Sequence, residues 1–254
     1  MCFDHDSRPP VVPIAGGALD SHDVVLEAAD GNRFAAFVAR AAEPTGAGIV
    51  ILPDVRGLHA YYRELAMRFA EHGVDAIALD YFGRTAGIGD RGPGFDYMPH
   101  VGQLTFDGLR ADTIAAAAQL RSEAGTPALF SIGFCMGGRL AFLSGTFGLG
   151  MAGVIGMYGW PTGGSRSNTP APIDLVAELE CPVLAIFGGA DEGIGIEPPR
   201  LFDEALTAAG VEHEVTVYPG APHSFFDRKA DEFAEASAAS WEQILGFIRG
   251  HTGG

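Results

Sequence analysis

The eight residues Ser-Ile-Gly-Phe-Cys-Met-Gly-Gly at positions 131–138 constrain the fold of this chain more than any other stretch. An apolar run that ends in closely spaced glycines predicts a buried strand, a tight turn and the start of a helix. Cys135 lies on the turn, with Gly133 and Gly137 two positions away on either side. A side chain at either glycine would clash as the chain reverses, and a residue on such a turn is accessible to a substrate. The motif therefore predicts a cysteine nucleophile, whereas a buried core cysteine is the alternative while the motif is considered alone.

Net charge and cysteine usage exclude several classes of protein. The 254 residues include 16 Lys and Arg against 32 Asp and Glu, a formal charge of -16, which disfavours nucleic acids and anionic membranes as partners. The cysteines Cys2, Cys135 and Cys181 form no even set and no C-x-x-C spacing, so we expect a reducing compartment, no disulfide framework and no metal site. The N-terminal residues have no signal-peptide pattern, and no apolar run approaches the roughly 20 residues that span a bilayer. We therefore expect a cytoplasmic protein that does not bind a membrane.

Strand-like and helix-like patterns alternate along the chain. Residues 1–22 are rich in Pro, Gly and Asp and predict an irregular arm, and residues 23–250 predict a single domain. Residues 24–27 and 33–39 flank the turn dipeptide Asp30-Gly31 and predict a hairpin. Further strands are expected at 48–52, 75–79, 128–132, 153–158, 183–187 and 212–218, and helices at 61–72, 106–123, 136–147, 175–179, 199–209 and 231–249. Loops are expected at 83–105 and 159–172. This alternation predicts an α/β fold with a mostly parallel central sheet and helices on both of its faces.

Two later loops supply the groups that a cysteine nucleophile needs. Asp191 follows the strand expected at 183–187, and His223 follows the strand expected at 212–218. The order nucleophile, acid, histidine is that of α/β-hydrolases, and it favours the catalytic interpretation of Cys135. His223 would accept the thiol proton, and Asp191 would fix the imidazole tautomer and stabilise the imidazolium. Glu192 is the neighbouring competitor with a poorer offset from its strand, and a turn or capping aspartate is the alternative for Asp191.

An oxyanion that forms during attack on a carbonyl needs two backbone N–H donors. Met136 follows the nucleophile at the N-terminus of a helix, so its N–H is the first expected donor. We expect the second donor at Val55, in the loop after the strand at 48–52.

Several motifs taken together resemble the dienelactone hydrolase family. They are Leu-Pro-Asp-Val-Arg-Gly at 52–57, Leu-Asp-Tyr-Phe-Gly-Arg at 79–84, Gly-Phe-Cys-Met-Gly-Gly at 133–138, Asp191, and His-Ser-Phe at 223–225. The likeness covers residues 24–249. It implies a single α/β-hydrolase domain with a Cys-His-Asp triad and no metal or organic cofactor. It also implies a hydrolase that opens a carboxylated enol-lactone in the breakdown of aromatic compounds.

The resemblance assigns roles to residues outside the triad. Asp54 takes the place of an acidic residue that guards the thiol, where glutamate is commoner, because a nearby carboxylate disfavours the thiolate. The alternative for Asp54 is a turn aspartate that caps the next helix. The family binds the substrate carboxylate with two arginines, and Arg84 matches the first position. Asp227 stands at the second position, and Arg228 follows it.

The remaining expectations concern the substrate and its pocket. Arg56 is a candidate for the second arginine, with a solvent-facing side chain as the alternative. Tyr158 and Trp160, with Tyr61, Phe82 and Phe225, are the aromatic candidates for lining the pocket, and packing is the alternative for each of them. The expected partner is a small-molecule lactone or ester, and we expect a monomer or a small homo-oligomer. A broader carboxylesterase of the same family, a non-catalytic binding module with this fold, and a redox role for Cys135 are the alternative functions.

Overall fold

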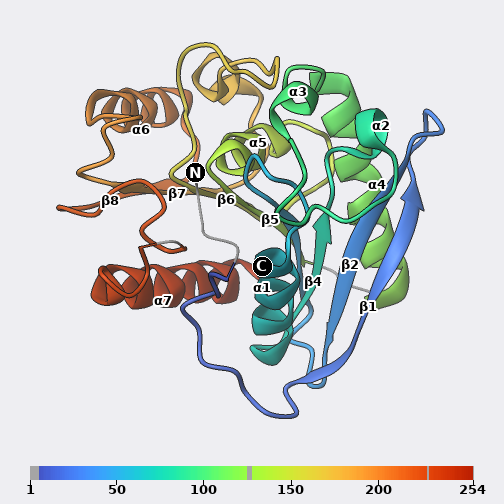
Figure 1. Cartoon of the computed structure of the whole chain (residues 1–254). Helices are drawn as coiled ribbons and strands as arrows, with labels where there is room; N and C mark the ends of the chain where they lie inside the picture. The colour runs from blue at the N-terminus through green and yellow to red at the C-terminus, as the bar shows by residue number, and fades with distance from the viewer. Residues whose placement is uncertain (1–5, 125–127, 228, 254) are drawn as a thin grey trace.

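The structure is a computed structural model that describes residues 6–124, 128–227 and 229–253 (Figure 1). Within these ranges, eight strands form one sheet in the order β1-β2-β4-β3-β5-β6-β7-β8. The strands are β1 (Ala18–Glu27), β2 (Arg33–Ala41), β3 (Ala47–Leu52), β4 (Val74–Leu79), β5 (Ala128–Phe134), β6 (Gly153–Met157), β7 (Val183–Gly188) and β8 (His213–Tyr218). Strand β2 pairs antiparallel with both of its neighbours, β1 and β4. The strands β4, β3, β5, β6, β7 and β8 pair with one another in parallel, in this spatial order.

Helices pack on both faces of the sheet (Figure 1). One face carries α1 (Ala60–Glu71) and α7 (Ala234–His251), and the other carries α4 (Phe106–Ala124), α5 (Met136–Ser144) and α6 (Glu197–Ala209). The short helices α2 (Gly83–Ala86) and α3 (Met98–Val101) follow β4, and the 3₁₀ helix η1 (Pro172–Glu178) precedes β7. The predicted α/β fold with a mostly parallel, doubly covered sheet is confirmed. None of the helices in the described ranges has both the length and the apolar character that crossing a bilayer requires.

The burial of the central strands explains their sequence pattern. Every residue of β3, β4, β5, β6 and β7 is buried, because helices cover both faces of these strands. Such strands have continuous apolar sequences instead of an alternating pattern. The edge strands β1 and β8 are mostly exposed or partly buried, and their sequences are correspondingly more polar.

Several predicted boundaries differ from the structure; for example, the helix expected at 136–147 ends at Ser144, and the helix expected at 231–249 spans Ala234–His251. Strand β1 begins at Ala18, so the described part of the irregular arm ends at Gly17 and not at residue 22. Its first half is a polar edge strand held by main-chain pairing with β2, and it therefore lacks an apolar face that the sequence could reveal. The loop expected at 83–105 contains α2 and α3, and the helix expected at 175–179 is a 3₁₀ helix that begins earlier, at Pro172.

The order of the strands determines where a site can form. From β3 the chain passes to β4 on one side, and β5 then pairs on the other side. Leu52 at the end of β3 is paired with Gly133, next to the end of β5. The loops after β3 and β5 therefore start side by side, at the switch point where ligands bind in sheets of this kind.

Candidate active site

Cys135 lies on the turn between β5 and α5 in a strained conformation. Its φ is 55° and its ψ is -114°, and 8% of the residue is exposed. Its N–H donates to the carbonyl of Met157 at 3.0 Å, and its own carbonyl accepts from the N–H of Gly138 at 3.1 Å. A positive φ at a non-glycine residue costs on the order of 1–3 kcal/mol and persists where the surrounding structure imposes it. The strain supports the interpretation of Cys135 as a presented nucleophile.

The glycines around Cys135 are required by close backbone contacts. A Cβ atom on Gly133 would lie 1.8 Å from the carbonyl oxygen of Gly137, and a Cβ atom on Gly137 would lie 2.0 Å from that of Leu52. A Cβ atom on Gly138 would lie 2.6 Å from the carbonyl oxygen of Met157. Since real Cβ atoms do not approach other atoms within 3.0 Å, α5 can pack against the ends of β3, β5 and β6 only with glycine at these positions. The steric reason predicted for the spacing is therefore present in the structure.

His223 and Asp191 form a hydrogen-bonded pair. His223 Nδ1 lies 2.6 Å from Asp191 Oδ2. The Asp191 side chain is 1% exposed, and its Oδ1 accepts the N–H groups of Gly193 at 2.9 Å and Ile194 at 3.1 Å. Because both carboxylate oxygens are engaged, this contact favours the tautomer of His223 with its proton on Nδ1, in which Nε2 is free to accept a proton. The competing residue Glu192 is exposed.

Two aromatic side chains pack against the ring of His223. The rings of Tyr158 and Trp160 each have their centroid 5.0 Å from that of the imidazole. The Tyr158 hydroxyl donates to Asp227 Oδ2 at 2.8 Å, and the Trp160 Nε1–H donates to the carbonyl of Gly193 at 3.2 Å. Burial, together with the charge of Asp227, raises the pKa of Tyr158 well above its usual value, so its hydroxyl remains a donor. Tyr158 and Trp160 therefore both lie beside the candidate base.

The loop after β3 contains the predicted guarding carboxylate. Asp54 is fully buried, and its Oδ1 accepts the N–H of Arg56 at 2.9 Å. This is the turn contact of the alternative interpretation, but α1 begins only at Ala60, with His59 at the capping position, so Asp54 does not cap it. Burial raises the pKa of Tyr81 well above its usual value, and the charges of Asp54, Asp80 and Cys135 raise it further. The hydroxyl of Tyr81 donates to the carbonyl of Pro53 at 2.8 Å, so Tyr81 lies beside this loop.

The arginines predicted to bind a carboxylate have different environments. Arg84 donates from Nε to Asp112 Oδ2 at 3.0 Å and from Nη2 to Asp112 Oδ1 at 2.8 Å. Its Nη1 also lies 2.5 Å from Asp30 Oδ2, so two carboxylates on the β1–β2 turn and on α4 hold this side chain. Arg56 is 5% exposed, which contradicts the solvent-facing alternative. Arg228 lies outside the described residues.

Two residues near the site were not assigned a role from the sequence. Asp227 is 4% exposed and accepts the hydroxyl hydrogen of Tyr158. Arg139, one helical turn after Cys135, is 2% exposed. Its signal in the sequence is a single charge in the otherwise uncharged helix segment Met-Gly-Gly-Arg-Leu-Ala-Phe-Leu-Ser.

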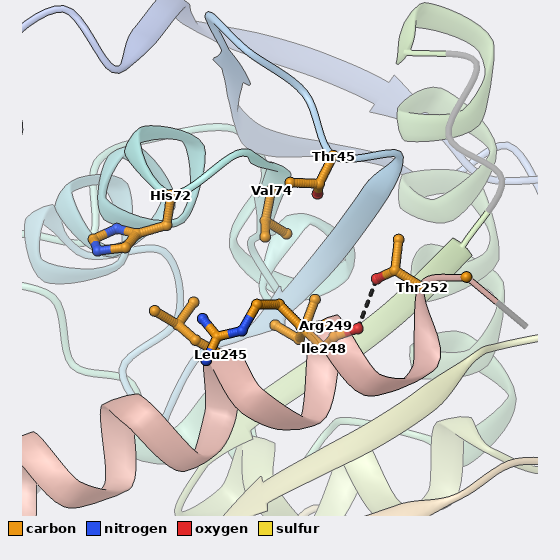
Figure 2. A pocket seen from close by; sticks show the side chains of 8 residues that line it. Thr45, His72, Val74, Leu245, Ile248, Arg249 and Thr252 are labelled. Atoms are coloured by element: carbon orange, nitrogen blue, oxygen red, sulfur yellow. Dashed lines mark hydrogen bonds between the residues drawn. The ribbon is translucent and has the colours of Figure 1, made fainter.

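Figure 2 shows a cavity at the opposite ends of the strands. Its volume is about 370 Å³, and it is lined by Thr45, His72, Val74, Leu245, Ile248, Arg249, Thr252 and Gly253. Val74 is the first residue of β4 and Thr45 precedes β3, whereas the residues of the candidate triad follow the last residues of their strands. The cavity therefore does not belong to the candidate active site. Within the described ranges, no group of three or more His, Cys, Asp or Glu side chains could hold a metal ion.

Comparisons with known proteins show which proteins this chain is similar to. Residues 34–252 match the model of the Dienelactone hydrolase family. A relative from Salmonella typhimurium, provisionally named carboxymethylenebutenolidase, is 28% identical over 263 residues that cover 96% of each chain. A relative from Methylorubrum extorquens with the same provisional name is 29% identical over 79% of this chain and 71% of its own. The crystal structure of a provisionally named dienelactone hydrolase from Klebsiella pneumoniae, 27% identical, superimposes with a TM-score of 0.77 over 91% of this chain and 99% of that one.

Proposed function

Because this chain belongs to the dienelactone hydrolase family and is a hydrolase of carboxylic esters or lactones, we propose that Cys135 carries the acyl group as a thioester during turnover. The observation that supports this proposal best is the bond of 2.6 Å between His223 and Asp191, on loops at the same end of the sheet as Cys135. A histidine fixed by a buried carboxylate is the base that a cysteine or serine nucleophile requires.

The reaction proceeds in two stages. His223 Nε2 takes the proton of the Cys135 thiol, and the sulfur attacks the carbonyl carbon of the substrate. The backbone N–H groups of Met136 and Val55 stabilise the resulting oxyanion; Met136 opens α5, where N–H groups have no partner within the helix. The C–O bond then breaks, the leaving oxygen takes the proton from His223, and a thioester remains on Cys135. In a lactone this oxygen stays attached to the acyl group as the ring opens.

The second stage regenerates the enzyme. His223 removes a proton from a water molecule, which attacks the thioester carbonyl. The C–S bond breaks, the carboxylic acid is released, and the proton returns to the sulfur of Cys135. We further propose that Asp54, buried in the loop after β3, acts before the first stage, because a carboxylate close to the thiol would disfavour the thiolate until a substrate is present.

Two substrate types are candidates. The provisional names of the curated relatives favour a carboxylated enol-lactone, the kind of compound formed in the breakdown of aromatic compounds. The two carboxylates that hold Arg84, and the buried Asp227 beside Tyr158, favour a broader esterase that acts on uncharged esters. Arg56 is the candidate for binding a substrate carboxylate in the first case.

Trapping the acyl group tests the nucleophile. Wild-type protein and the Cys181→Ala variant, quenched in acid during turnover of an aryl ester, should both show the mass of one acyl group, and Cys135→Ala should show neither adduct nor turnover. Both cysteines are buried, so Cys181→Ala is a matched control. Unchanged hydrolysis by Cys135→Ala would overturn the proposal.

A pair of substrates separates the two substrate types. The carboxylated lactone and its uncharged methyl ester are compared by kcat/KM, with wild-type protein and with Arg56→Met. A preference for the carboxylate that disappears in Arg56→Met supports the enol-lactone. Equal or higher activity on the methyl ester supports the broader esterase.

A further inference from the structure

We propose that Arg139 is a positioning residue that fastens the loop at 159–171 to the nucleophile helix and thereby holds His223 and Asp191 in place. The inference rests on the proposed function, because it assumes that these two residues act with Cys135. It concerns a residue that need not touch the substrate.

The guanidinium of Arg139 is enclosed by one loop. Its Nε donates to Thr169 Oγ1 at 3.0 Å, and its Nη1 donates to the carbonyls of Trp160 at 3.1 Å and Thr162 at 3.2 Å. Its Nη2 donates to the carbonyls of Gly163 at 2.7 Å, Thr169 at 3.2 Å and Pro170 at 2.8 Å. The loop has no regular secondary structure between β6 and η1. Its shape is therefore held by these hydrogen bonds to Arg139 instead of by the main-chain hydrogen bonds of a helix or a strand.

An arginine is specifically suited to this arrangement. A guanidinium presents five N–H donors in a planar fork, whereas a lysine ammonium presents three at a single point. Arg139 is 2% exposed and its hydrogen bonds run to carbonyl and hydroxyl oxygens, so the loop takes the place of water around the charge. Burial lowers the pKa of Arg139 to about 10, and the charge of Asp174 opposes this shift. Burying a charged group costs free energy unless hydrogen bonds compensate for the lost water. Packing alone therefore does not explain why an arginine stands at this position.

The start of the enclosed loop reaches the catalytic residues directly. Trp160, whose carbonyl binds Arg139, packs its ring against His223. Its Nε1–H binds the carbonyl of Gly193, and the N–H of Gly193 binds Asp191 Oδ1. A continuous set of contacts therefore connects Arg139 on α5 to both the base and its carboxylate partner.

The helix end of this connection is equally fixed. The N–H of Arg139 lies 3.3 Å from the carbonyl of Cys135, its acceptor in the first turn of α5. A Cβ atom on Gly159 would lie 2.4 Å from the backbone nitrogen of Arg139, so the loop also begins in contact with the helix. Movement of the loop relative to α5 would consequently change the position of His223 relative to Cys135.

The test replaces Arg139 by Met and by Lys and compares each variant with Arg121→Met. Arg121 is the matched control, because its Nη2 also holds loop carbonyls, those of Leu149 and Gly150, before the amino end of β6. The chain has two tryptophans, Trp160 and Trp241. In a Trp241→Phe background the fluorescence reports on Trp160 alone, and this change removes no hydrogen bond of the Trp241 ring in the described structure.

We expect Arg139→Met to lower kcat about 100-fold, the effect of a misplacement on the order of 1 Å, with a smaller change in KM. The acidic limb of the kcat/KM profile should move to lower pH, because a neighbouring carboxylate raises the pKa of a histidine and the contact with Asp191 would loosen. Emission of Trp160 should shift to the red and be quenched more readily by acrylamide. Arg139→Lys should show the same changes to a smaller extent, and Arg121→Met should show none of them.

The outcomes separate this inference from the proposed function. A fall in thermal stability without the changes in pH profile and Trp160 emission would make Arg139 a merely structural residue and overturn the inference. If Arg139→Met does not fold, Arg139→Lys and Thr169→Val supply the same measurements. Loss of turnover in Cys135→Ala with a fully active Arg139→Met would contradict only the positioning role. Full turnover in Cys135→Ala would contradict the proposed function itself.

Discussion

Replacing Gly137 by alanine should destabilise this protein, although the same change in an ordinary helix is stabilising. Gly137 lies in the first turn of α5, and a Cβ atom there would be 2.0 Å from the carbonyl oxygen of Leu52 and 2.2 Å from that of Pro53. Real Cβ atoms stay at least 3.0 Å from such atoms, so α5 and the loop after β3 must separate by about 1 Å. The carbonyl of Pro53 is itself fixed by the hydroxyl of Tyr81 at 2.8 Å, which resists the movement.

The separation should affect both stability and catalysis. Overpacking of this kind costs about 1–3 kcal/mol in the free energy of unfolding. The two surfaces that must part carry the proposed oxyanion donors, Met136 on α5 and Val55 on the loop. A displacement of about 1 Å between such groups lowers kcat by roughly 100-fold. Urea denaturation and the steady-state hydrolysis of an aryl ester measure the two effects.

Gly246 supplies the matched control. It lies in α7, and the nearest atom to a Cβ at this position would be Arg249 Nη2 at 4.0 Å, so the methyl group has room. Gly246→Ala should therefore stabilise the protein by about 0.5–1 kcal/mol and leave kcat unchanged. A Gly137→Ala variant that gained stability and kept its kcat would refute the argument that backbone proximity requires the glycine.

Three further experiments concern Asp191, Asp54 and Cys181. Asp191→Asn should lower kcat by about 10⁴-fold with little loss of thermal stability, because asparagine holds the wrong imidazole tautomer of His223. Glu192 is exposed, so the control variant Glu192→Gln should have normal kinetics. Asp54→Asn should increase the rate at which iodoacetamide alkylates Cys135 at neutral pH without substrate, since the carboxylate no longer disfavours the thiolate; an unchanged rate would contradict the guarding role. Burial raises the pKa of Cys181 from 9.0 to about 12. The contribution of this thiol to the free energy of unfolding is therefore complete below pH 9 and disappears as pH rises towards 12. In a Cys2→Ser background, a thiol reagent should therefore label Cys181 of the folded protein at pH 8 more slowly than Cys181 of the unfolded protein, and equal rates would contradict the raised pKa.

The residues that the sequence identified are those whose requirements are local. The glycines around Cys135 are forced by backbone atoms a few residues away or on the paired strand, and a spacing of two residues is visible in any sequence. Asp191 follows the buried strand β7 and His223 follows the edge strand β8, each at a short offset, so a strand pattern and one polar residue after it were sufficient to predict the bonded pair.

The contacts that the sequence did not reveal join residues that are distant along the chain. Arg84 is held by Asp30, which is 54 positions away in the sequence, and Arg139 by Thr169, which is 30 positions away. No local sequence pattern distinguishes an arginine that binds two carboxylates from one that donates hydrogen bonds to several backbone carbonyls. The early start of β1 has the same origin, because main-chain pairing with β2 can hold a polar strand that has no apolar face.

The tip of the loop at 159–171 should tolerate substitutions that its buried positions do not. The loop contacts His223 through Trp160 and contacts α5 through Arg139. At its tip Gly164 and Arg166 are exposed, whereas Ser167 and Thr169 are buried. Substitutions at the tip should therefore change neither the shape of the loop nor the position of His223, while those at the buried positions act on catalysis from a distance. Local motifs determine the chemistry of the site, but the accuracy of its geometry depends on contacts that form only after the chain has folded.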